Sequence, residues 1–322
     1  MRYGTTMVTT DQSMDVVELA RATEERGFDS FYVPEHTHIP VSRITPPATG
    51  EDELPEMYTR MLDPFVALGA AAAVTERIEL GTGIALPAQR EPIVTAKAIA
   101  TLDHISCGRM VLGIGFGWNE DEIANHGVEF RQRREVCREH VLAMQALWGD
   151  EVGSFRGEHV TVEPSWSWPK PARQADGRVG PPVLVGGGSG EKLFAHIAEY
   201  GDGWIPIGGA GLAEAIPRLR DTVAAAGRDP SALRIVPFGS LPDPAKLEHF
   251  ESIGVTECVF RIPSATADEV LPVLDRWATL IAERRGPAEP DRATSGPIRP
   301  IAAADVPAAR GRSAPPVPRP PR

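Results

Sequence analysis

The sequence predicts a (β/α)8 barrel, and three observations support this fold class. Segments of strand type alternate with segments of helical periodicity from the first residues to about residue 285. Strict alternation of this kind implies parallel strands joined by right-handed crossovers. Eight such pairs can be counted, and eight is the number that a closed barrel requires. An open, doubly wound sheet needs only about five to seven strand–helix units and is therefore the alternative.

The first four strand–helix pairs are indicated by short apolar runs, each followed by an amphipathic segment. Gly27 suits the position just after the first helix, where a left-handed backbone is common. Pro92 suits the first turn of the third helix, where its missing N–H has no cost. We expect strands over residues 2–8, 29–34, 77–86 and 108–115, and helices over 14–27, 63–75, 91–106 and, with a break, 119–149.

The second half of the barrel follows the same pattern. Two irregular segments, residues 35–60 and about 150–180, are long enough to act as lids. We expect strands over residues 181–187, 202–207, 233–239 and 256–263, and helices over 191–201, 212–227, 243–254 and 267–285.

The composition changes at Gly286. Residues 286–322 contain 10 of the 31 prolines and no Phe, Trp or Tyr. Such a segment cannot bury enough apolar area to offset the entropy lost on ordering. We therefore expect one barrel domain over residues 1–285 and a disordered, Pro- and Arg-rich tail over residues 286–322.

Charge and composition exclude several classes of protein. The net charge of −11 argues against a nucleic-acid partner, which would need a basic face. No apolar run approaches the roughly 20 residues of a membrane span, and the N-terminus lacks a signal-peptide core. Three widely spaced cysteines fit a reduced compartment better than a disulfide scaffold or a zinc site. These features predict a cytoplasmic protein that acts on a small molecule.

Active-site residues of a barrel follow the carboxyl ends of its strands. Glu35 and His36 follow the second predicted strand, and Gly83 and Ile84 lie at the end of the third. The segment GGGSG at residues 186–190 follows an apolar strand and opens a helix, so its backbone N–H groups can converge on a phosphate. Ser189 adds a hydroxyl donor to this turn.

His36 suits general acid–base chemistry because a histidine titrates near neutral pH. The alternative is a histidine that only packs or caps the loop. A metal site is not expected, since His36 and His38 have no evident third ligand. The segment GIGFGW at residues 113–118 lacks the G-x-G-x-x-G spacing of a dinucleotide site, which argues against NAD binding.

The sequence resembles the bacterial-luciferase-like flavin and deazaflavin oxidoreductases from Tyr3 to about Ala282. The order and spacing of its motifs carry this resemblance. The matching segments are GFDSFYVPEHTHIP (27–40), LDPFVALGAAAAVTERIELGTGIALPAQREP (62–92), KAIATLDHISCGRMVLGIGFGWNEDE (97–122) and PPVLVGGGSG with AEYGDGWIP (181–206). The string VPEHTHIPVSR resembles the branch that depends on the deazaflavin F420.

The resemblance implies a barrel that binds F420 or FMN at its carboxyl face. An acid–histidine pair would be the catalytic group, and it matches Glu35 and His36. A strand-end bulge, often with a non-prolyl cis peptide behind the cofactor ring, matches Gly83 and Ile84. The other positions that match cofactor-binding residues are Gly115, Phe116 and Gly117 beside the ring, Gly186, Gly187, Gly188 and Ser189 at the phosphate, and Asp202, Gly203 and Trp204 near the cofactor tail.

Three functions follow from these expectations. We favour an F420-dependent oxidoreductase that transfers a hydride to or from a small organic substrate. The second is an FMN-dependent two-component monooxygenase, which would need a partner flavin reductase. The third is a non-catalytic protein that binds a cofactor or another protein. Relatives are often homodimers, but no feature of this sequence fixes the oligomeric state. Trp118, Trp166, Trp168 and Trp204 are candidate apolar walls of the site.

Overall fold

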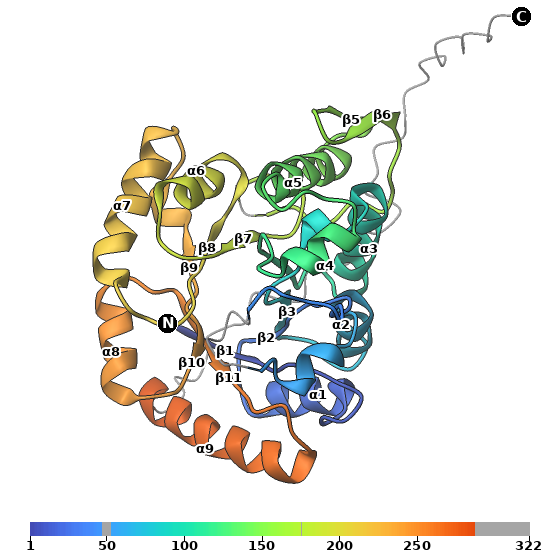
Figure 1. Ribbon diagram of the computed structural model, residues 1–322. Helices are drawn as coiled ribbons and strands as arrows, with labels where there is room; N and C mark the ends of the chain where they lie inside the picture. The colour runs from blue at the N-terminus through green and yellow to red at the C-terminus, as the bar shows by residue number, and fades with distance from the viewer. Residues whose placement is uncertain (47–52, 175, 287–322) are drawn as a thin grey trace, which may run out of the picture.

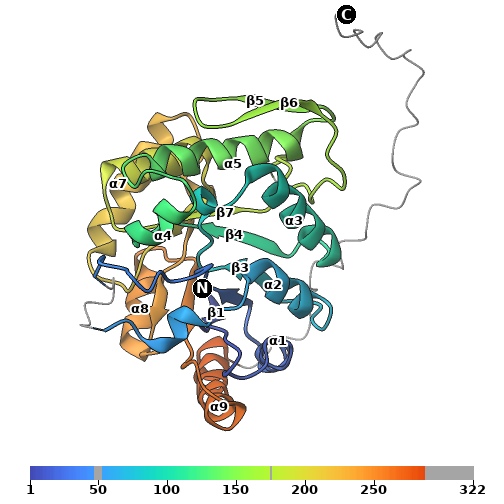
Figure 2. The ribbon, with the colours of Figure 1, turned by 45° about the vertical axis from the view of Figure 1, so that its right-hand side comes forward.

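The fold is described from a computed structural model, in which residues 1–46, 53–174 and 176–286 are described. A parallel sheet curls around an apolar centre, and helices cover its outer face (Figure 1; Figure 2). Its strand order is β10-β11-β1-β2-β3-β4-β7-β8-β9. This arrangement confirms the α/β fold with parallel strands. The predicted tail lies outside the described residues except for Gly286.

The strands follow the predicted positions closely, each within about four residues of its expected bounds. The one difference in number lies at residues 233–239, where the structure has two short strands. Pro237 separates them, since proline lacks the N–H that a continuous ladder needs. The strands of the sheet are β1 (Arg2–Thr6), β2 (Ser30–Val33), β3 (Glu79–Thr82), β4 (Met110–Ile114), β7 (Val183–Gly186), β8 (Gly203–Ile205), β9 (Arg234–Ile235), β10 (Phe238–Ser240) and β11 (Glu257–Arg261).

The helices follow the strands in alternation. Asp15, Asp63, Glu91 and Asp243 precede four of them and accept hydrogen bonds from backbone N–H groups of the first turn. These caps fix where each helix begins. The helices are α1 (Val16–Glu25), α2 (Pro64–Ala72), α3 (Pro92–Ile105), α4 (Glu120–Asn125), α5 (Arg133–Gly149), α6 (Glu191–Tyr200), α7 (Leu212–Ala225), α8 (Pro244–Ser252) and α9 (Ala267–Arg285).

Apolar side chains form two separate layers. The larger layer lies between the strands and the helices. The smaller one fills the inside of the curled sheet, and Ile84 packs against it from the carboxyl end. It consists of Tyr32, Val111, Leu184, Ile205, Val236, Phe238 and Val259. Apolar side chains therefore fill the inside of the sheet, and at its carboxyl end they form the bottom of any site located there.

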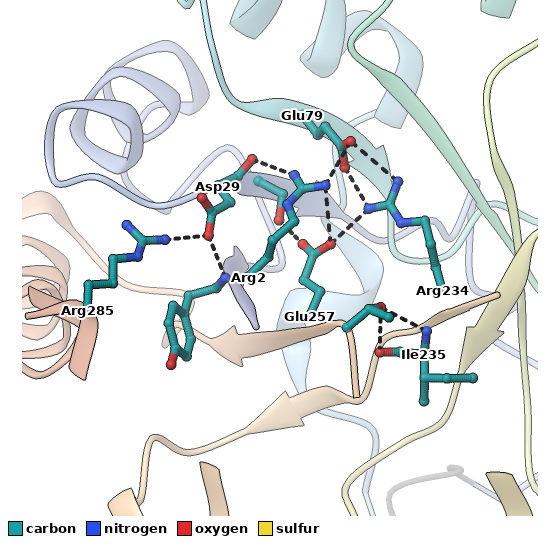
Figure 3. Close-up of polar contacts among 10 residues, drawn as sticks. Arg2, Asp29, Glu79, Arg234, Ile235, Glu257 and Arg285 are labelled. Carbon is teal, nitrogen blue, oxygen red and sulfur yellow. Dashed lines mark hydrogen bonds and ion pairs between the residues drawn. The ribbon is translucent and has the colours of Figure 1, made fainter. Parts of the chain in front are cut away.

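A charged network occupies the opposite, amino end of the sheet (Figure 3). Arg234 donates to Glu79 at 2.6 Å and to Glu257 at 2.8 Å, and Arg2 pairs with Glu79 at 2.9 Å. Burial would raise the pKa of Glu79, but Arg234 and Arg2 together hold it below its ordinary value. The Ser30 hydroxyl donates to Glu257. This network joins strands that are far apart in sequence.

The irregular segment at about 150–180 contains an antiparallel hairpin that the sequence analysis missed. Strands β5 (Gly153–Arg156) and β6 (Thr161–Ser165) pack against α5, which both ribbon views show. Glu139 of α5 accepts hydrogen bonds from three backbone N–H groups of residues 158–160. This part of the segment therefore covers a helix instead of forming the expected lid.

Trp166 and Trp168 follow this hairpin and are 75% and 56% exposed. They do not form the walls of the predicted site. The remaining short elements are the 3-10 helices η1 (Glu56–Thr59), η2 (Pro87–Gln89) and η3 (Pro230–Ala232). Within the described ranges, no helix combines the length and apolar character that crossing a membrane requires.

Candidate active site

The loops after four neighbouring strands meet at the carboxyl end of the sheet. Val33 of β2 pairs with Thr82 of β3, and Ile114 of β4 pairs with Val185 of β7. The bridge between Ala85 and Ile114 continues the pairing past the end of β3. This register brings the loops that begin after Val33, Thr82, Ile114 and Gly186 to one face. Most of the predicted site residues lie on these loops.

The peptide bond between Gly83 and Ile84 is cis. The Gly83 N–H donates to the Val33 carbonyl at 2.7 Å, and the Gly115 N–H donates to the Ala85 carbonyl at 2.9 Å. A Cβ atom at Gly115 would collide with Cδ1 of Ile84, and one at Gly186 would lie 3.3 Å from its Cγ2. Ile84 therefore spans the ends of neighbouring strands and forms an apolar platform above the inner core.

His36 is held by hydrogen bonds at both ring nitrogens. Its Nδ1 lies 2.7 Å from Oε2 of Glu122, and its Nε2 accepts from the indole N–H of Trp118 at 3.3 Å. The side chains of His36 and Glu122 are 7% and 0% exposed. In the neutral ring, Nδ1–H donates to the carboxylate and Nε2 keeps its lone pair. This tautomer is suited to accept a proton at Nε2.

Glu35 contacts different groups from His36. Its Oε2 accepts from the Leu86 N–H at 2.7 Å, and its Oε1 accepts from Nε of Arg90 at 2.5 Å. Burial raises the pKa of Glu35, and Arg90 opposes this rise. Glu35 and His36 share no hydrogen-bond partner in the described structure. The acid that contacts His36 in this structure is Glu122, and the catalytic role of Glu35 stays a prediction.

Sequence reasoning did not single out Glu122. It is one of three consecutive acids, Glu120, Asp121 and Glu122, in the first turn of α4. Only Glu122 is fully buried, because it shares the inward face of the helix with Ile123. The apolar residue Ile123 next to Glu122 was the one signal in the sequence that Glu122 is buried. It does not reveal that Glu122 contacts His36.

The glycine loop after β7 leads into α6. Gly187 has φ of +145°, a conformation that L side chains rarely adopt. Apart from its two neighbours in the chain, no described residue has an atom within 4 Å of a Cβ built on Gly188. Gly190 precedes α6 without a side-chain cap. The Trp204 indole donates to the Gly187 carbonyl at 2.8 Å. Trp204, which is 2% exposed, thus braces the loop from within the core and is no open wall.

Asp202 and Gly203 lie at the other end of the sheet from this loop. Asp202 precedes β8, and Gly203 is its first residue. Both therefore lie at the amino end of the parallel sheet. Asp202 accepts from the Val183 N–H at 2.8 Å and pairs with Arg178 and Arg228. The prediction that these two residues contact the cofactor tail is therefore corrected to a structural role.

Phe116 also differs from expectation. Its ring centroid lies 5.1 Å from that of His196 and 4.4 Å from the guanidinium carbon of Arg134. These contacts place the ring among the helices. The cofactor contacts expected of Gly115 and Gly117 stay predictions. Among the described side chains, no group of three or more His, Cys, Asp and Glu is arranged to hold a metal ion.

This combination of fold and site defines a class of protein. Residues 3–241 match the sequence model of the luciferase-like monooxygenases, and the chain belongs to this family. The family model describes monooxygenases, and relatives of this chain include F420-dependent dehydrogenases and a pyrimidine monooxygenase, so membership supports an oxidoreductase.

Particular relatives cover most of the chain. The uncharacterized protein Rv0953c of Mycobacterium tuberculosis is 46% identical over 285 residues, which are 88% of this chain and 99% of that protein. The F420-dependent glucose-6-phosphate dehydrogenase of Kineococcus radiotolerans is 30% identical over 66% of this chain and 59% of its own length. The crystal structure of the monooxygenase RslO1 from Streptomyces bottropensis has a TM-score of 0.72 and 18% identity, and covers 89% of this chain and 100% of its own.

Proposed function

We propose that the protein is an F420-dependent oxidoreductase that transfers a hydride to or from a small alcohol or carbonyl compound. The observation that carries this proposal is the buried Glu122–His36 pair at the carboxyl end of the sheet, the end at which Ile84 packs against the inner core. A proton-transfer group of this kind is what hydride chemistry at an alcohol carbon requires. The 30% identical relative, which is named for its dependence on F420, supports the same cofactor.

The residues present fit a phosphate-bearing cofactor with a flat ring. The open space at Gly188 and the uncapped start of α6 provide backbone N–H donors for a phosphate group. Ser189 is exposed on the same loop and adds a hydroxyl. Ile84 would lie behind the ring, and Gly115 keeps the adjoining turn free of a side chain. Gly83, Gly117, Gly186 and Gly187 would shape the same pocket through their backbone.

When bound, F420 supplies a carbon centre that carries two electrons as a hydride. His36 would accept the hydroxyl proton of an alcohol at Nε2 while the alcohol carbon loses its hydride, and it would return the proton in the reverse direction. Glu122 would hold the ring in the required tautomer and stabilise the cation that forms. Trp118 occupies Nε2 in this structure, so the substrate hydroxyl would replace the indole N–H there.

The FMN-dependent monooxygenase is the second candidate, because the same loop suits the phosphate of either cofactor and the family takes its description from monooxygenases. It would require reduced flavin from a partner reductase. The importance of His36 for turnover distinguishes the two candidate functions, since a hydride transfer that is coupled to a proton transfer needs this group in every turnover. A protein without activity would not need it at all.

We also infer that the curled sheet is a complete (β/α)8 barrel, in which β9 and β10 act as the two halves of one strand. β9 pairs with β8, and β10 pairs with β11. The bridge between Ile207, which follows β8, and Phe238 of β10 brings the two edges of the sheet together. Residues 1–285 would then form one domain.

The glycine loop can be tested by Gly188→Val. The protein itself has room for this side chain, so the melting temperature should stay within about 1 °C of the wild type. The valine side chain would occupy the space that a bound phosphate needs, so we expect the Kd for F420 to rise at least about tenfold. Fluorescence titration of the purified protein measures it.

Gly69→Ala provides the matched control, because Gly69 lies in α2 and also has open space around a Cβ atom. It should leave the Kd unchanged. An unchanged Kd in Gly188→Val with an intact fold would remove the phosphate site from this loop and leave the proposed function without its cofactor anchor.

A further inference from the structure

A chain of hydrogen bonds next to His36 joins the loop after β2 to the end of α4. The hydroxyl oxygen of Thr37 lies 3.0 Å from Nδ1 of His38 and 2.9 Å from Nε2 of His126. Nε2 of His38 lies 3.2 Å from the amide nitrogen of Asn125. Thr37 and His38 directly follow His36, whereas Asn125 and His126 end α4. The chain therefore joins positions 87 and 89 residues apart in the sequence.

The direction of these hydrogen bonds follows from the groups that take part. An amide N–H can only donate, so Asn125 donates to Nε2 of His38, which must carry a lone pair. The neutral His38 ring then has its proton on Nδ1, and this N–H donates to the Thr37 hydroxyl oxygen. The Thr37 O–H in turn donates to Nε2 of His126, which must also be unprotonated. The complete chain therefore requires that both imidazole rings are neutral.

Protonation of the two rings opposes this chain. A proton on Nε2 of either ring removes an acceptor, and two imidazolium ions would repel each other because the ring centroids of His38 and His126 are 5.4 Å apart. Burial lowers the pKa of His126, and the charges of His38 and Arg90 also lower it, while Glu122 opposes them. The chain is therefore complete above about pH 6.5, the ordinary pKa of histidine, and weakens as the pH falls below it.

The surroundings of His126 offer no carboxylate that is free to pair with an imidazolium. His126 lines a cavity of about 400 Å³, and the other titratable or charged residues that line it are Arg90, Glu91, His140 and His159. Glu91 accepts from the first N–H groups of α3, and Glu122 is engaged by His36. Burial lowers the pKa of His140, so this ring also disfavours positive charge in the cavity. A protonated His126 would therefore not be compensated by these groups.

A second contact holds the far end of the same loop on α4. Asp121 accepts from the Thr45 hydroxyl at 2.8 Å and from the N–H groups of Ile44 and Thr45 at 3.2 Å. These hydrogen bonds lower the pKa of Asp121, so this contact does not titrate in the range of histidine. Val41 lies between the two contacts and is fully exposed. Loss of the histidine chain would free one end of the loop while the other end stays attached.

We propose that His38, Thr37 and His126 form a pH-sensitive clasp, which holds the loop that follows His36 on α4 at neutral pH and releases it at acidic pH. The clasp goes beyond the proposed function, because its chemistry requires neither a cofactor nor a substrate. In the proposed reaction these three are positioning residues, since His36 immediately precedes Thr37 in the chain.

The test places a nitroxide spin label at Val41 and follows its mobility by electron paramagnetic resonance from about pH 7.5 to about pH 5. The labelled protein is Val41→Cys with Cys107→Ser, because Cys107 is exposed and the other two cysteines are buried. The rotational correlation time should shorten at least about twofold, with a midpoint at or below about pH 6.5. Adding His38→Gln and His126→Gln should abolish this change, because glutamine offers a donor and an acceptor but does not titrate.

Val66→Cys with Cys107→Ser is the matched control. Val66 is also strongly exposed, but it lies on α2, and its label should not respond to pH in this range. The clasp is overturned if the mobility at Val41 does not change. It is also overturned if the same change occurs in the double glutamine variant or at Val66.

The clasp and the proposed function fail separately. The spin-label experiment uses the protein without cofactor, so a failure of F420 to bind would remove the proposed function alone. Where F420 is turned over, acidification should lower kcat/KM at a higher pH in the wild type than in the variant with His38→Gln and His126→Gln. Equal pH profiles of the two proteins would overturn the positioning role.

Discussion

Replacing His36 by alanine is expected to lower kcat/KM by about 10²–10⁴-fold and to change the Kd for F420 less than about threefold. The reason is that His36 is placed to move a proton at Nε2, while the cofactor is held by the glycine loop and the Ile84 platform. Steady-state turnover of F420 with an alcohol or carbonyl that the wild type accepts measures the first quantity. Fluorescence titration measures the second.

Glu122→Gln extends the same test to the group that holds His36. An amide in place of the carboxylate cannot stabilise an imidazolium and favours the wrong tautomer. We expect about a 10²-fold loss of kcat/KM with little change in KM. Glu120→Gln, on the exposed side of the same helix turn, should have no effect. If His36→Ala weakened catalysis and cofactor binding equally, His36 would belong to binding and not to chemistry.

The second large effect is expected at the amino end of the sheet. Arg234→Met should lower the free energy of unfolding by about 3 kcal/mol, because it leaves Glu79 and Glu257 without their shared cation in a largely buried position. Urea denaturation measures this loss. Arg156→Met removes a pair with Glu163 in which both side chains are more than 70% exposed, and it should cost less than about 1 kcal/mol.

The same network sets a direction for the pH dependence of stability. The pKa of Glu79 is lowered from 4.5 in the folded protein, so its contribution is complete above about pH 4.5 and is lost as the pH falls through the lower native value. Wild-type stability should therefore decline below about pH 4.5. The decline should be shallower in Glu79→Gln. An identical pH profile for that variant would contradict the ion-pair account.

The regular elements could be predicted because each has its own periodicity. The segment at residues 256–263 has an apolar centre at Cys258, Val259 and Phe260 and contains β11, and the segment at 267–285 matches α9 at both ends. The hairpin of β5 and β6 gave no such pattern. Its side chains are mostly exposed, and β6 has one buried residue, Val162, so no alternation of apolar and polar residues marks it. Its pairing and its place on α5 are tertiary effects.

The candidate site could be predicted from the sequence only for residues that directly follow a predicted strand. Residues that follow a strand, such as His36 and Gly187, were placed by the topology alone. Glu122 was missed, since its contact with His36 joins positions 86 residues apart. Asp202 was misplaced because the resemblance supplied a motif but not the end of the strand on which it lies. A sequence shows which residue types are present, and the direction of each side chain comes from packing.

The central claim is that this family member uses F420, and a competitive titration tests it most directly. The cofactor-free protein is titrated with F420, and then with F420 in the presence of excess FMN, and the fluorescence is followed. We predict a Kd for F420 that is micromolar or lower and that a hundredfold excess of FMN changes by less than about twofold. Tighter binding of FMN than of F420, or binding of neither, would contradict the account.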